Sequence, residues 1–133
     1  MTMTPLTIEV PGPPVPKQRP RIMRRKDGSG SHYGFTPKKT ADFERHVQTC
    51  AIDALNRWRR QEQQKWPGNK RFALSMWFFF PDHRVRDLDN CVKSVTDALN
   101  KTVFDDDRQI DEIYAIRELD RDEPRTIVVV RPL

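Results

Sequence analysis

Alternation of apolar and polar residues predicts four β-strands. In the first, Thr4–Val10, apolar side chains alternate with polar ones, as in a strand with one buried face. The second, Lys70–Phe80, is apolar at nearly every position, so we expect a central strand that is covered on both faces. The third, Ile113–Leu119, carries charges and is expected at an edge, and a short β-branched run over Thr126–Val130 closes the sheet.

Apolar residues at three- and four-residue spacing predict two helices. The first has Thr36 as its N-cap and Pro37 at the first helical position, and it runs to about Gln63. Its apolar stripe consists of Phe43, Val47, Ala51, Ala54, Leu55 and Trp58. The second helix covers Asp87–Lys101, and its apolar stripe consists of Leu88, Val92, Val95 and Leu99, with Cys91 and Ala98 beside it.

The elements follow the order β-α-β-α-β-β. This order predicts an α/β (α+β) fold, a single compact layer of a small mixed sheet with two main helices. The 133 residues are enough for one domain over 1–133 with its own core. A basic loop rich in proline and glycine, over 11–35, lies within that domain.

The charge of the chain is unevenly distributed. The formal net charge is +5, with Lys and Arg concentrated over 17–26, 38–45 and 57–71 and acidic residues over 82–89 and 105–123. A basic surface around an acidic pocket is typical of an enzyme that cuts a polyanion.

Two further features bear on where the protein works. No apolar run approaches the roughly 18–20 residues that cross a bilayer, so we expect no membrane association. Cys50 and Cys91 lie in predicted helices without CxxC spacing, which favours reduced thiols and a cytoplasmic location.

Carboxylates are concentrated where the second helix begins. Asp87 and Asp89 follow the central strand, and an acidic triplet, Asp105–Asp107, follows the helix. One aspartate can be explained as the N-cap of the helix, where free backbone N–H groups favour negative charge. The others repel one another unless a divalent cation lies between them, and carboxylate oxygens are the ligands that Mg²⁺ requires.

Helix geometry limits which of these groups can act together. Asp97 lies about 12 Å from Asp89 along a helix, so we expect it to pair with Lys93 or Lys101 rather than to bind the same ion. Lys93 is either such a partner or a group that stabilises negative charge on a phosphate in the transition state. The acidic triplet reaches the ion only if residues 102–107 fold back along the helix or a second subunit supplies it.

The basic loop carries cationic residues between prolines and glycines over 17–31. Two interpretations are open, because loops of this length are usually either functional or disordered. The loop is a solvated flexible arm, or it is an arm that grips DNA phosphates.

Several spaced motifs extend over the second helix and the acidic triplet. They are Arg86-Asp87-Leu88-Asp89-Asn90, Lys93, Asp97-Ala98-Leu99 and Asp106-Asp107-Arg108-Gln109-Ile110. With the segments 12–21 and 36–40, they resemble the RusA-type Holliday junction resolvases, crossover junction endodeoxyribonucleases often encoded by phages and prophages. The resemblance covers nearly the whole chain.

This resemblance implies a homodimer with a mixed α/β fold that uses Mg²⁺ to cut symmetrically across a four-way DNA junction. The essential aspartates of the family correspond to Asp87, Asp89 and Asp107 and its essential lysine to Lys93, and Asp106 is the alternative third metal ligand. The family also implies DNA contacts from basic residues near the site. From the clustering of charge, we assign these contacts to Lys17, Arg19, Arg21, Arg24, Arg25, Lys38 and Lys39.

Two other functions are compatible with the same residues. A nuclease directed at flaps or other branched DNA would share the site but prefer a different structure. A non-catalytic DNA-binding module would use the acids only to cap a helix and to pair with arginines. Such a module would bind DNA in a salt-sensitive way and give no Mg²⁺-dependent product.

Overall fold

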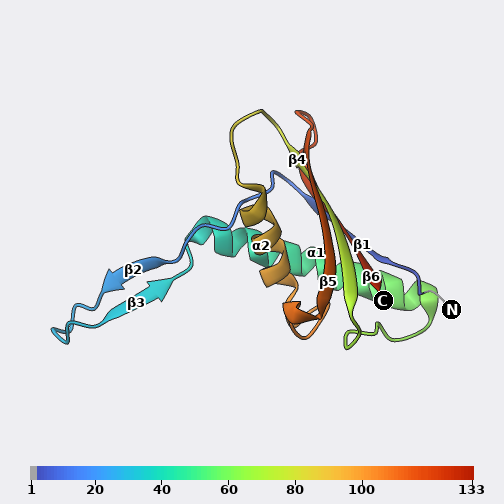
Figure 1. The fold of residues 1–133 in the computed structure, drawn as a ribbon, viewed down its shortest axis with the longest axis horizontal. Coiled ribbons are helices and arrows are strands. Elements are labelled where there is room, and N and C mark those ends of the chain that lie inside the picture. Colours follow the sequence, from blue (N-terminus) through green and yellow to red (C-terminus); the bar gives the residue numbers. More distant parts are fainter. Residues whose placement is uncertain (1–2) are drawn as a thin grey trace.

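A computed structural model describes residues 3–133, except for the side chain of Arg21. Its elements are β1 (Leu6–Pro11), β2 (Arg21–Arg24), β3 (His32–Phe35), α1 (Lys38–Glu62), β4 (Phe72–Phe80), α2 (Leu88–Leu99), the 3₁₀ helix η1 (Asp107–Gln109), β5 (Ile110–Leu119) and β6 (Arg125–Pro132). They confirm the predicted mixed α/β fold and, apart from β2, β3 and η1, the predicted order of elements (Figure 1).

Four strands form one mixed sheet in the order β1-β6-β4-β5. β4 pairs parallel with β5 and antiparallel with β6, and β6 pairs antiparallel with β1. The parallel pair is joined through α2, since parallel neighbours need a crossover connection. β4 is therefore central and β5 lies at an edge, as predicted, whereas β6 lies inside the sheet between β1 and β4.

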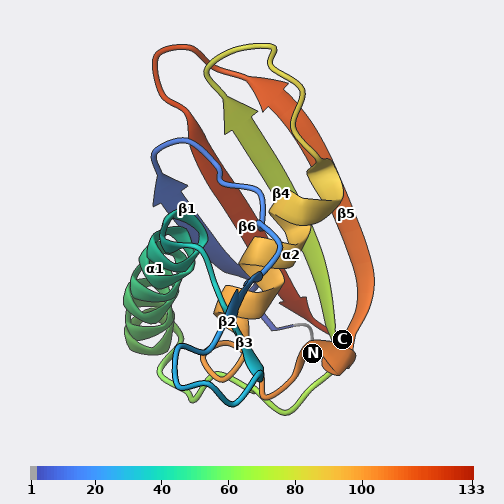
Figure 2. The same cartoon turned by 90° about the vertical axis from the view of Figure 1, so that its left-hand side faces the viewer.

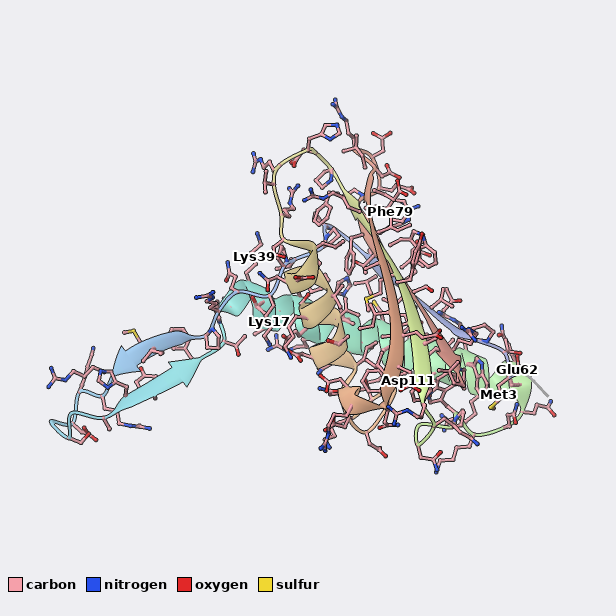
Figure 3. The ribbon with its side chains drawn as sticks, viewed as in Figure 1. Met3, Lys17, Lys39, Glu62, Phe79 and Asp111 are labelled. Carbon is pink, nitrogen blue, oxygen red and sulfur yellow. The ribbon has the colours of Figure 1, made fainter. Side chains whose placement is uncertain are left out.

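Both helices pack on the same face of the sheet (Figures 1 and 2). The core beneath them contains the inward-facing residues of three strands: Phe72, Leu74, Met76, Phe78 and Phe80 of β4, Leu6, Ile8 and Val10 of β1, and Val128 and Val130 of β6. On the other face, Trp77 and Phe79 are only half-buried, and Figure 3 shows Phe79 on the side away from the helices. The prediction that β4 is covered on both faces is therefore wrong for the described residues. Arg125 partly takes the place of a second layer, since its guanidinium lies 3.9 Å from the Phe79 ring centroid.

The helices agree with their predicted spans but differ in detail. In α1, all of the predicted stripe is buried except Leu55, which is half-buried. The N-cap is Pro37 rather than Thr36, because Pro37 has an extended ψ of 145° while its carbonyl accepts the first helical hydrogen bond, from the Ala41 N–H at 3.0 Å. No helix of the described chain is long and apolar enough to span a bilayer.

The buried face of α2 is rotated from its predicted stripe. It is centred on Cys91, Val95 and Ala98, whereas Leu88 and Val92 are only half-buried. The rotation follows from the position of α2, which contacts both α1 and β5.

Part of the stretch predicted as a loop is a hairpin. β2 and β3 pair antiparallel, and the resulting ribbon projects away from the sheet and helices (Figure 1). Its base is fixed, because the Lys17 N–H donates to the Asn90 carbonyl at 2.8 Å and the Gln18 N–H to Thr40 Oγ1 at 3.1 Å. The arm, as we call residues 18–36, thus begins directly beside the first turn of α2.

Candidate active site

The start of α2 carries two candidate metal ligands. Asp87 is the N-cap: its Oδ1 accepts from the Asp89 N–H at 3.0 Å and its Oδ2 from Asn90 Nδ2 at 3.2 Å. Asp89 lies in the first turn and is exposed. Capping explains the position of Asp87 but not that of Asp89. Because each carboxylate oxygen offers about two acceptor sites, Asp87 retains capacity for a cation while it caps the helix.

Two arginines fix the loop that leads into α2. Arg86 Nη1 donates to Asp82 Oδ1 at 2.7 Å, and its guanidinium lies 4.6 Å from the Phe80 ring centroid. Arg117, on β5, donates through Nη2 to the carbonyl oxygens of Arg84 at 3.3 Å and Arg86 at 2.9 Å, and it lies 5.3 Å from the same ring. The loop is therefore tied to the carboxyl ends of β4 and β5.

Lys93 belongs to a chain of charges. Its Nζ donates to Asp97 Oδ1 at 2.9 Å, and Lys17 Nζ lies 2.9 Å from Asp97 Oδ2 and 2.7 Å from Glu44 Oε1. Burial alone would raise the pKa of Asp97, but the hydrogen bonds from Lys93 and Lys17 lower it. Burial would likewise lower the pKa of Lys17, yet its hydrogen bonds to Glu44 and Asp97 raise it. The predicted pairing of Asp97 with Lys93 is confirmed, and Lys17 links that pair to α1 (Figure 3).

A glutamine holds the acidic triplet in place. Gln109 Oε1 accepts from the N–H groups of Asp105 and Asp106, both at 2.9 Å. Its Nε2 donates to the carbonyl oxygens of Gly68 at 2.9 Å and Lys70 at 2.7 Å. Two of these bonds hold the triplet and the other two reach the turn that precedes β4, so Gln109 attaches the acids to the end of the sheet.

Within the triplet, Asp106 and Asp107 differ in their local roles. Asp106 is the N-cap of η1, and its Oδ1 accepts from the Arg108 N–H at 2.9 Å. This bond and those from the Arg108 side chain lower the pKa of Asp106. Asp107 follows the cap as the first residue of η1. Unlike Asp87, which also caps a helix, Asp106 is paired with a cation, because Arg108 Nε lies 3.3 Å from its Oδ1; this pairing makes Asp107 the better candidate ligand.

The two groups of acids lie at opposite ends of α2 (Figure 1). The helix has 12 residues, a length of about 18 Å at 1.5 Å per residue. Asp87 and Asp89 are at its start, near the carboxyl ends of β4 and β5, whereas Asp107 precedes the amino end of β5, which Asp111 marks in Figure 3. Residues 102–107 therefore do not fold back along α2. In the part of one chain that the structure describes, no three acidic, His or Cys side chains could hold a metal ion together.

The residues assigned to DNA contacts are found around the arm. Arg19, Arg24 and Arg25 are exposed on it, and Lys38 and Lys39 are exposed at the start of α1. Figure 3 shows Lys39 near the base of the arm. Lys17 is instead held between two carboxylates, so its geometry gives it a structural role. The side chain of Arg21 lies outside the described structure.

The chain is similar to known proteins over most of its length. A family model described as endodeoxyribonuclease RusA matches residues 11–131. The chain belongs to the RusA endodeoxyribonuclease family. A curated relative, the crossover junction endodeoxyribonuclease RusA of Aquifex aeolicus (strain VF5), is 27% identical over 121 residues, or 90% of this chain and 85% of the relative. The RusA resemblance inferred from the motifs is thereby confirmed, and with it the assignment of the chain to a family of nucleases.

Two residues that fix the segments carrying the candidate acids had no predicted role. Arg117 lies on the same face of β5 as Ala115 and pairs with Phe78 of β4. An arginine among the apolar residues of that face is a feature of the sequence that could have identified it. Gln109 follows Asp106 at the spacing of a capping box, which is also readable from sequence. Lys17 gave no such signal, because its partners Glu44 and Asp97 are remote along the chain.

The ion pairs of Asp97 predict a pH-dependent contribution to stability. Replacing Asp97 with Asn should lower the free energy of unfolding by about 1–3 kcal/mol at pH 7, the usual cost of losing hydrogen bonds to a charged group. Because folding lowers the pKa of Asp97 below its ordinary 3.8, this stabilisation is present above that value and is lost as the pH falls through the folded-state pKa. Urea unfolding of the unaltered protein and of Asp97→Asn should be measured from pH 7 to pH 3. The difference between their free energies of unfolding should shrink below about pH 4.

The control for this experiment is Asp53→Asn. Asp53 pairs with Arg57 on the exposed surface of α1, where an ion pair contributes about 0–1 kcal/mol. An equal loss of stability in both variants at pH 7, or a difference for Asp97→Asn that does not shrink at all between pH 4 and pH 3, would contradict the assigned role of Asp97.

Proposed function

We propose that this RusA-family chain is a Mg²⁺-dependent endonuclease that resolves four-way DNA junctions by paired, symmetric cleavage. The observation that carries the proposal is the arrangement at the start of α2. Asp87 and Asp89 stand one residue apart with Lys93 one turn further on, and the loop before them is held by Arg86 and Arg117. The name of the relative from Aquifex aeolicus supports a crossover junction as the substrate.

The proposed ligands of Mg²⁺ are Asp87, Asp89 and Asp107. All three offer carboxylate oxygens, the donor that Mg²⁺ prefers, and waters complete its octahedron. Asp106 is the alternative, but its ion pair with Arg108 makes it the weaker choice. When bound, Mg²⁺ supplies positive charge that stabilises the phosphoryl group as water displaces the leaving oxygen.

The proposed role of Lys93 follows from its present partner. The Lys93 side chain is 56% exposed while it pairs with Asp97, so it can turn toward a phosphate without leaving a buried cavity. A cation in that position stabilises negative charge that develops on the phosphate oxygens in the transition state. Asp97 keeps a second partner in Lys17, so its carboxylate is not left uncompensated when Lys93 moves.

The separation of the acids supports a site that is completed by a second subunit. β5 is an edge strand of ten residues, and strand edges of this length usually pair or are protected. Ile113, Tyr114 and Leu119 on β5 are exposed, with 42–58% of their surface accessible. If two copies of β5 pair antiparallel about a twofold axis, the amino end of each strand lies beside the carboxyl end of the other. Asp107 of the partner subunit would then lie near Asp87 and Asp89, twice in each dimer.

The first test of the function is cleavage. With an end-labelled synthetic four-way junction and Mg²⁺, the protein should nick opposed strands symmetrically, and a duplex of the same sequence should stay intact. Asp87→Asn should cut at least about 100-fold more slowly, since a metal ion contributes several kcal/mol to the transition state, while junction affinity in EDTA stays unchanged. Asp53→Asn, with its exposed carboxylate on α1, is the matched control.

Other outcomes of this experiment would favour other functions. Undiminished cleavage by Asp87→Asn would show that Asp87 is not a ligand of the catalytic metal. Binding without product in any of several divalent metals would mean that the acids are structural and that the chain is a DNA-binding module. Preferential cleavage of flaps or forks in the same assay would identify a different branched substrate.

The proposed dimer makes a separate prediction. Ile113→Lys with Tyr114→Lys places like charges on two facing copies of β5, which disfavours pairing. Sedimentation at micromolar concentration should show a dimer for the unaltered chain and a folded monomer without cleavage activity for the variant. Ile52→Lys, at a comparably exposed apolar position on α1, should remain an active dimer. A double variant that stays dimeric would exclude β5 as the interface.

The arm predicts how affinity depends on salt. Each phosphate contact contributes about 0.9 to the slope of log affinity against log salt. Replacing Arg19 and Arg24 with Gln should weaken binding to junction and duplex alike and flatten that slope by about 2. Replacing Arg60 and Arg121, which are exposed elsewhere, removes the same charge and should leave the slope nearly unchanged. Equal slopes for both variants would mean that the arm does not contact phosphates.

A further inference from the structure

The hairpin of the arm is built as a defined ribbon. β2 and β3 pair Arg21 with Phe35, Ile22 with Gly34, Met23 with Tyr33 and Arg24 with His32. The Arg25 N–H donates to the Ser31 carbonyl at 2.9 Å and closes the ribbon. The tip turns through Gly28 and Gly30, with φ of 82° and 75°, values that residues with a side chain rarely adopt.

Strand pairing sorts the side chains of the hairpin onto two faces. Directly paired residues share a face, and residues two apart along a strand share it as well. Met23, Tyr33 and Phe35 therefore lie on one face, which we call the aromatic face, and Ile22 lies on the other with Arg24 and His32. The Tyr33 and Phe35 ring centroids are 6.4 Å apart, and the Arg25 guanidinium lies 5.3 Å from the Tyr33 centroid.

Nothing in the described chain covers the aromatic face. The exposed fractions are 45% for Met23, 42% for Tyr33 and 39% for Phe35, and every described side chain of β2 and β3 is exposed. A two-stranded hairpin in water is at best marginally stable, and exposed apolar clusters commonly mark binding surfaces. The face is therefore suited to contact with another molecule.

The charge around the face indicates the chemistry of that molecule. The arm, residues 18–36, contains five Lys or Arg and a single acid, Asp27 at the tip. A second copy of this arm would bring like charges together, whereas a nucleic acid offers phosphates to the arginines and flat bases to the rings. Aromatic side chains and arginines beside a basic surface are the common means of stacking unpaired bases.

We propose that Met23, Tyr33 and Phe35 form a platform on which unstacked bases at the branch point of junction DNA are stacked. The inference rests on the proposed function, since a continuous duplex keeps its bases stacked within the helix and offers only its grooves and backbone. The base of the arm is bonded to Asn90, next to Asp89, so the platform and the catalytic carboxylates are attached to the same helix turn. Binding at the branch would thereby set the position of the scissile phosphate.

The test uses a four-way junction with 2-aminopurine beside the branch point, in EDTA so that no cleavage occurs. The unaltered protein should change the 2-aminopurine fluorescence, which reports base stacking. Tyr33→Ala with Phe35→Ala should abolish that change and lower junction affinity at least about tenfold, given the contribution of each stacked base. Its affinity for plain duplex and its salt slope should stay unchanged, which distinguishes the platform from the phosphate contacts of Arg19 and Arg24.

The matched control is Ile22→Ala, which removes the exposed apolar side chain of the opposite face and should leave the fluorescence change intact. One contrary result is that the unaltered protein cuts the junction while the double variant binds it with the same affinity and the same fluorescence change. That result would refute the stacking platform and leave the proposed nuclease function standing. Loss of self-association by the double variant would show that the arm contacts a second copy, and it would overturn the proposal. An unaltered protein that neither binds nor cuts the junction would refute the proposed function as well.

Discussion

The length of α2 is the constraint on which the rest of the account depends. A helix of 12 residues holds Asp87 and Asp89 at one end of the sheet, and the chain returns to Asp107 only at the other end. Ligands of one ion must lie within a few ångströms of each other, and about 18 Å of helix prevents this within a subunit. Any site that uses all three carboxylates must therefore draw on two copies of the chain.

Each end of α2 is fixed by side chains that take no part in the proposed chemistry. Arg117 ties the loop before Asp87 to β5, and Gln109 ties the triplet to the turn before β4. Lys17 joins the start of the arm to Asp97 and thereby to Lys93. These bonds attach both groups of acids to the central sheet, so a symmetric pairing of two sheets would reproduce the same geometry at both sites.

The fold was predictable to the extent that it depends on local pattern. The stripe of α1 and the central position of β4 followed from the spacing of apolar residues, and the edge position of β5 followed from its charges. The apolar pattern on both faces of β4 was misleading. It suggested a second covering layer, but in the described chain Arg125 covers only part of the outer face, at Phe79. The hairpin was missed because β2 and β3 have only four residues each and their described side chains are all exposed, so no buried side imposes alternation.

For the candidate site, the sequence suggests which residue types take part but not how they are arranged. The motifs shared with the RusA family point to Asp87, Asp89, Lys93 and the acidic triplet as candidate site residues, and helix geometry argued against Asp97 as a ligand of the same ion. The spacing of residues along the chain, however, does not tell whether Asp107 acts with Asp87 and Asp89 of its own subunit or with those of the other copy. Nor could it show that Lys17, grouped with the DNA-binding cations by charge, lies between two carboxylates.

The most direct test of this account mixes two inactive variants, Asp87→Asn and Asp107→Asn, and measures cleavage of the four-way junction after subunit exchange. If Asp107 of the partner subunit completes the site, each mixed dimer contains one site with both mutations and one intact site. Single-strand nicking should then reappear in the mixture, although neither variant cuts alone. If the mixture remains as inactive as its components while exchange is demonstrated, the three carboxylates belong to one subunit or Asp107 is not a ligand, and the shared site is contradicted.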